Sequence, residues 1–166
     1  MTKAINLGCT DVNDYKQRGD YYSELGLNEK ARNDYQKALL ILKNPSSYSD
    51  YTDRAGIKEM LEDYKGAITD YTSAIELDTA CKFCVRLYGL RAHCKAKIRD
   101  YVGALEDYTK NLQLNSSPSL ETGEVYCNRG IVKLNMDNIK GACEDLRLAS
   151  NMGYMRAFDL IKEHCR

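Results

Sequence analysis

Two cysteines, Cys81 and Cys84, form a C-x-x-C motif at the start of a predicted helix, where the helix dipole lowers a thiol pKa. Such a pair is typical of redox sites and of zinc sites. The next candidate zinc ligands, His93 and Cys94, lie more than two helical turns further on, roughly 15 Å away by helical rise. The motif also lacks the βαβ context of thioredoxin-like proteins. A thiol or metal function therefore stays open as an alternative, and no metal is assigned.

The cysteine count bears on the redox state of the chain. Seven cysteines are an odd number spread along the sequence, so they cannot all close into intramolecular disulfides. We expect mostly free thiols in a reducing compartment.

The other chemistry-bearing residues give no catalytic motif. His93 and His164 are the only histidines, and neither stands with a Ser, Asp or Glu in a recognisable nucleophile motif. No glycine-rich phosphate loop follows a predicted strand. Most of the notable acids recur at the same place in a repeating unit, which indicates a structural role. We expect no enzyme and no cofactor.

Composition excludes several other classes. The 166 residues hold 24 Lys plus Arg against 24 Asp plus Glu, so no net charge favours nucleic acid or an anionic membrane. No apolar run approaches the 18 or so residues of a membrane helix. The first residues contain no visible export signal. We expect a cytoplasmic protein, or a periplasmic or secreted one if a signal precedes this sequence.

The elements that would position these residues are repeats. Segments 34–42 (DYQKALLIL), 70–78 (DYTSAIELD) and 107–115 (DYTKNLQLN) are copies of one another, and a Tyr-x-x-Arg-small element precedes each. The small residue lies 12 positions before an Ala in every unit, as Ala55 lies before Ala67. Apolar positions three and four apart indicate helix faces. Each of the four units is therefore predicted to be a pair of antiparallel helices.

The predicted helices, followed by a final capping helix, cover residues 12–26, 28–43, 48–62, 64–77, 82–98, 101–114, 119–136, 139–150 and 154–164.

These units resemble the tetratricopeptide repeat. The family's aromatic residue, a small residue four places later, and an Ala followed four places later by an aromatic correspond to Tyr51, Ala55, Ala67 and Tyr71. The family's Trp is Tyr here, its Leu is Arg, and its closing Pro is absent. The resemblance implies an all-α, right-handed superhelical solenoid whose first helices line a concave groove that binds peptides or helices of partner proteins.

The resemblance implies a single repeat domain, 1–166. Its parts are the end of a partial repeat or an N-terminal cap at 1–8, repeats at 11–44, 47–78, 82–115 and 119–151, and a capping helix at 153–166.

A non-enzymatic protein-interaction scaffold is the function that we expect from this resemblance, with a peptide or helix of another protein as partner. The residues expected to line the groove are Lys16, Asp20, Thr52, Glu59, Arg86, Gly89, His93, Lys97, Cys127 and Asn135. Residues 82–99 hold six Lys or Arg and no acid, so an acidic segment is expected to bind at the third repeat. A helical-repeat nucleic-acid binder using this basic repeat is the other alternative, although no nucleic acid or membrane partner is expected.

Two structural predictions follow from the repeat. An Arg and an Asp separated by 16 residues recur in every unit and are expected to pair: Arg18 with Asp34, Arg54 with Asp70, Arg91 with Asp107, and Arg129 with Asp145. Asn111 stands where the other units have Ala38, Ala74 and Ala149, so Asn111→Ala is expected to stabilise the chain.

Overall fold

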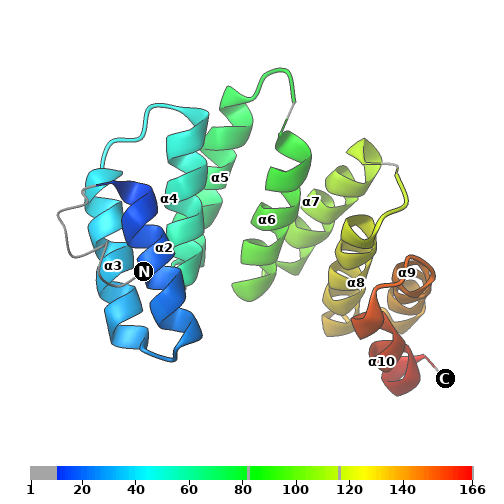
Figure 1. The fold of residues 1–166 in the computed structure, drawn as a ribbon. Helices are drawn as coiled ribbons and strands as arrows, with labels where there is room; N and C mark the ends of the chain where they lie inside the picture. The colour runs from blue at the N-terminus through cyan, green and yellow to red at the C-terminus, as the bar shows by residue number, and fades with distance from the viewer. Residues whose placement is uncertain (1–10, 82, 116, 166) are drawn as a thin grey trace. The chain divides into compact units, whose positions relative to one another are not determined.

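A computed structural model describes residues 11–81, 83–115 and 117–165, and this part of the chain contains α-helices and no strand. The helices are α2 (Val12–Glu24), α3 (Asn28–Ile41), α4 (Tyr48–Met60), α5 (Tyr64–Leu77), α6 (Cys84–Lys97), α7 (Tyr101–Leu114), α8 (Leu120–Asn135), α9 (Ile139–Asn151) and α10 (Met155–His164) (Figure 1). Each end lies within two residues of its predicted place. The all-α class is confirmed, and the predicted segment at 1–8 lies outside the described residues.

Side-chain caps and left-handed turns define the helix ends. Ser47 begins α4 with a capping box, because its hydroxyl accepts from the Asp50 N–H while the Asp50 carboxylate accepts from the Ser47 N–H. Asp100 and Asn138 cap α7 and α9 by accepting the N–H of the third helical residue. The turns inside the four hairpins each contain one residue with positive φ: Gly26, Glu62, Arg99 and Asp137. These left-handed residues close the helix C-termini and reverse the chain.

The helices form two compact units, residues 1–77 and 78–166. Unit 1 contains the hairpins α2–α3 and α4–α5, and unit 2 contains α6–α7, α8–α9 and α10. The alanines at the recurring position, Ala31, Ala67, Ala104 and Ala142, are at most 3% exposed. Their small side chains allow the two helices of each hairpin to approach closely.

Helix α10 closes the core of unit 2. Ala157 is fully buried against Cys127, Leu146 and Ala149, and further apolar residues of α8 and α10 pack around them. A disulfide between Cys143 of α9 and Cys165 joins the end of α10 to the preceding hairpin. The C-terminal segment is therefore held to α9 by packing and by a covalent bond.

The expectation of mostly free thiols is wrong. Two disulfides, Cys81–Cys84 and Cys143–Cys165, engage four of the cysteines. Cys94 and Cys127 lie outside these disulfides and are fully buried. An odd count forbids a complete set of disulfides, but it does not forbid two local ones.

None of the helices in the described ranges is long and apolar enough to cross a bilayer.

Candidate functional site

A salt bridge recurs inside each hairpin. The Arg of the first helix donates from Nε and from one terminal nitrogen to the two oxygens of the Asp in the second helix, so the pair is bidentate. The closest distances are 2.6 Å for Arg18–Asp34, 2.5 Å for Arg54–Asp70, 2.7 Å for Arg91–Asp107 and 2.7 Å for Arg129–Asp145. The structure thus brings together the residues that the 16-residue spacing pairs.

A lysine that sequence reasoning missed joins three of these pairs. Lys58, Lys95 and Lys133 lie 2.8, 2.9 and 2.8 Å from the same carboxylates. Each also donates to a backbone carbonyl at the start of the second helix. The signal was present in the sequence, because a Lys stands four residues after the Arg in these units, where the first unit has Tyr22.

The same Arg stacks on the Tyr one turn before it, with the guanidinium carbon 5.4–5.6 Å from the ring centroid in all four hairpins. We call each set of Tyr, Arg and Asp, with the Lys where present, an ionic rung. Burial raises the pKa of Asp70, but hydrogen bonds from Arg54 and Lys58 outweigh it, and the net pKa lies below the usual value. The hydrogen bond to Asp70 in turn raises the pKa of Arg54. Each ionic rung is therefore a salt bridge between the two helices of one hairpin, which indicates a structural role.

The groove residues expected in unit 1 mostly have partners within the fold. Asp20 accepts a hydrogen bond from the Tyr35 hydroxyl at 2.7 Å, and Glu59 accepts one from Tyr71. Burial, together with the bond to Asp20, raises the pKa of Tyr35. These two acids therefore orient framework tyrosines.

The other two expected groove residues of unit 1 make local contacts. Lys16 lies 3.9 Å from Asp53 in a partly exposed pair, and Thr52 donates to the backbone oxygen of Ser49.

Unit 2 contains a basic pocket of about 230 Å³. It is lined by His93, Ala96, Lys97, Tyr101, Tyr108, Asn128, Ile131, Val132, Asn135 and Arg156. Three expected groove residues, His93, Lys97 and Asn135, meet here, and no acid is among the lining residues. Sequence reasoning missed Arg156, because it comes from α10, which was assigned only a capping role.

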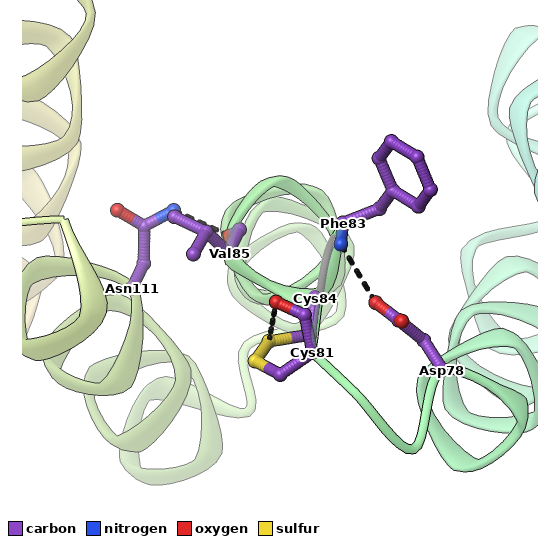
Figure 2. Close-up of a disulfide and its surroundings, with 6 residues drawn as sticks. All are labelled: Asp78, Cys81, Phe83, Cys84, Val85 and Asn111. Carbon is purple, nitrogen blue, oxygen red and sulfur yellow. Dashed lines mark hydrogen bonds between the residues drawn. A yellow bond between two sulfur atoms is a disulfide. The ribbon is translucent and has the colours of Figure 1, made fainter.

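Gly89, one of the expected groove residues, has a side chain of α7 packed beside it. A Cβ added to it would lie 3.1 Å from the Asn111 amide nitrogen, which donates to the Val85 carbonyl at 2.7 Å (Figure 2). Asn111 thus fills the space beside Gly89, while its own buried amide oxygen has no hydrogen-bond partner among the described residues.

Two other expected groove residues also lie outside the pocket. Cys127 is fully buried beneath α10, where burial raises its thiol pKa, so it cannot contact a ligand. Arg86 is exposed but does not line the pocket.

The C-x-x-C motif is a disulfide that lies just before α6, with Cys81 exposed and Cys84 2% exposed (Figure 2). The Asp78 carboxylate accepts a hydrogen bond from the Phe83 N–H at 2.7 Å. This bond closes the loop that leads from Asp78 into α6. As a disulfide, the two sulfurs supply no thiolate to a metal. In the described ranges no three His, Cys, Asp or Glu side chains are grouped to hold a metal ion.

Residues 15–41, which span most of the first hairpin, match the family model for the tetratricopeptide repeat. The matched segment is a tetratricopeptide repeat. The match contains Arg18 and Asp34, so the first ionic rung lies inside a recognised tetratricopeptide repeat. No curated protein matches the sequence.

Solved structures show the same tetratricopeptide fold. YrrB, described as a TPR protein with an unusual peptide-binding site, is 19% identical with a TM-score of 0.67, over 97% of this chain and 79% of its own. The Cut9–Hcn1 hetero-tetramer of APC/C gives a TM-score of 0.71 at 17% identity, over 94% of this chain and 30% of the other. The type IV pilus biogenesis factor PilW gives 0.70 at 14% identity, over 91% and 66%. At these low identities, the structural similarity establishes the fold alone.

Proposed function

We propose that this tetratricopeptide protein is a non-enzymatic interaction scaffold, and that the basic pocket of unit 2 binds an acidic segment of a partner protein. The observation that carries the proposal is the pocket lining, which joins His93, Lys97 and Arg156 with no acid among them. Two neighbours in fold, the peptide-binding protein YrrB and the Cut9–Hcn1 complex, support this class of function.

The charges in the pocket differ from those of the ionic rungs. The rung cations are mostly buried and paired, whereas Lys97 and Arg156 are exposed and form no ion pair within the described ranges. A carboxylate bound between them would lose little of its hydration, and each of its exposed ion pairs would contribute modestly because solvent screens it. The pocket can therefore select charge at modest desolvation cost.

The polar and apolar parts of the lining suit a peptide. Asn128 and Asn135 offer amide donors and acceptors to a peptide backbone, while Ile131, Val132 and the ring of Tyr101 supply apolar surface. A volume of about 230 Å³ accommodates one or two acidic side chains.

The test is fluorescence anisotropy with a fluorescein-labelled hexapeptide of alternating Asp and Glu, and with its Asn/Gln counterpart. Lys97→Glu/Arg156→Glu should weaken binding of the acidic peptide at least tenfold. The matched control, Lys110→Glu/Lys140→Glu, makes the same charge change at exposed positions of unit 2 outside the lining and should stay within twofold. Affinity should fall as salt rises. Equal losses in both double variants, or equal binding of both peptides, would refute the pocket assignment.

The disulfides bear on where the scaffold works. Structural disulfides persist in oxidising compartments, and two of them are present in unit 2. We therefore propose a compartment outside the reducing cytoplasm, in place of the cytoplasmic location expected from the sequence.

A further inference from the structure

We propose that the Cys143–Cys165 disulfide regulates the basic pocket by holding α10, the helix that supplies Arg156. This inference rests on the proposed function, because it concerns ligand binding at the same pocket. It assigns a redox-dependent role to a pair of cysteines that the scaffold function alone does not require.

Helix α10 is short and is held to unit 2 along one face. It contains ten residues, a length at which an isolated helix is unstable in water. Ala157, Leu160 and Ile161 face the core of unit 2, whereas Met155 and Phe158 on the opposite side are 74% and 40% exposed. Its two ends are tied to α9 by a turn at Gly153, with φ of 81°, and by the disulfide.

The disulfide is the stronger of the attachments at the C-terminal end of α10. It joins residues 22 positions apart, and loop-closure entropy for such a cross-link favours the closed arrangement by roughly two orders of magnitude. Cys165 also donates its N–H to the Ile161 carbonyl at 2.9 Å, so the bonded cysteine continues the last turn of α10. Once the disulfide opens, non-covalent packing, mainly that of Ala157, Leu160 and Ile161, keeps the C-terminal end of α10 docked.

The position of α10 determines whether the charge of Arg156 lies at the pocket. Of the pocket-lining side chains, Lys97 and Arg156 carry a permanent charge at neutral pH, and Arg156 is the lining residue from α10. Undocking α10 therefore removes half of the permanent positive charge. It also exposes the apolar face around Cys127 and Leu146, which α10 covers in the docked state.

The chemistry of the switch is thiol–disulfide exchange. A dithiol reductant transfers two electrons and two protons to the Cys143–Cys165 disulfide, which becomes two thiols, while the reductant becomes a disulfide. An oxidised dithiol of the same class reverses the step. Cys165 is partly exposed at the end of α10, which gives an attacking thiolate access to the bond.

The experiment measures binding of the labelled Asp/Glu hexapeptide to the full chain in three forms. These are the oxidised chain, the chain reduced with dithiothreitol, and the Cys143→Ser/Cys165→Ser variant under oxidising conditions. We expect the last two to bind at least fivefold more weakly than the first. The control, Cys81→Ser/Cys84→Ser, lacks the other disulfide and should bind as the oxidised chain does and lose affinity on reduction.

Arg156→Gln separates this mechanism from a general loss of structure. If the disulfide acts by placing Arg156, the oxidised and reduced forms of Arg156→Gln should bind within twofold of each other. Hydrogen exchange should also show faster exchange of α10 amides on reduction, with α6 and α7 unchanged. A fivefold redox effect that persists in Arg156→Gln, or equal affinity of the oxidised and reduced native chain, would overturn the inference. Failure of the oxidised chain to bind the acidic peptide would instead refute the proposed function together with its regulation.

Discussion

Asp70→Asn should be among the most destabilising single substitutions in unit 1. The Asp70 side chain is 1% exposed and accepts charge-assisted contacts from both Arg54 and Lys58, whose side chains are each 19% exposed. Removing one partner of a buried ionic group costs about 3–5 kcal/mol when the remaining charge stays buried. Because the side chains of Arg54 and Lys58 remain partly hydrated, we expect a loss of unfolding free energy at the lower end of this range, about 3 kcal/mol. A hydrogen bond to a charged group contributes about 1.5–3 kcal/mol to stability, which gives a similar figure.

Asp34→Asn is the matched variant. Asp34 is equally buried in the same unit but faces one cation, Arg18, because Tyr22 stands at the lysine position. We expect about 2 kcal/mol for Asp34→Asn, and less than about 0.5 kcal/mol for Asp53→Asn, whose partner Lys16 is 3.9 Å away and about one-third exposed. The assay is urea unfolding followed by circular dichroism at 222 nm.

The order of the three free energies tests the reasoning more sharply than any single value. A loss for Asp70→Asn of less than about 1 kcal/mol, or one smaller than that of Asp34→Asn, would refute the claim that both cations depend on this carboxylate.

The remaining predictions concern acid stability, the α6–α7 contact and the buried thiols. The pKa of Asp70 lies below its usual value of 3.8 in the folded chain. Its contribution to stability should therefore be complete above about pH 4 and fall as the pH drops through the folded pKa. Between pH 6 and pH 2, the urea midpoint of Asp70→Asn should decline less than that of the native chain. Gly89→Ala should destabilise the native chain by crowding Asn111, yet stabilise the Asn111→Ala background by about 1 kcal/mol through helix propensity, a sign change that a double-mutant cycle in urea would detect. Asn111→Ala alone should no longer stabilise, because it leaves a void beside Gly89. Cys94 and Cys127 should resist iodoacetamide in the folded oxidised chain and react once it is unfolded; rapid modification of both in the native state, measured by mass spectrometry, would contradict their burial.

The helices and the salt bridges were accessible from sequence because both depend on local spacing. A constant hairpin length places Arg54 opposite Asp70, so the pairing needs no knowledge of how hairpins pack. The lysine of the rung was accessible too, since Lys58 follows Arg54 by one helical turn. It was overlooked because an exposed lysine is the ordinary case.

The pocket depended on contacts between hairpins and was therefore only partly predictable. Periodicity identified His93 and Lys97 on one helix face, but Arg156 joins them because α10 packs against α8 and α9. Cys127 followed the same periodicity but is covered by α10, and Asn111 packs beside Gly89. Local spacing does not reveal which neighbour covers a face.

The ionic rungs have a consequence for the modularity of the array. The carboxylates of Asp70, Asp107 and Asp145 are each paired with an Arg and a Lys of their own hairpin, and that of Asp34 is paired with Arg18. The contact of Arg129 with the preceding hairpin goes to an uncharged acceptor, the Thr109 hydroxyl. A hairpin can therefore be duplicated or deleted without leaving a buried charge unpaired. Arrays of different length built from this unit would each be electrostatically complete, and lengthening the chain would require compensating changes only at the apolar contacts between neighbours.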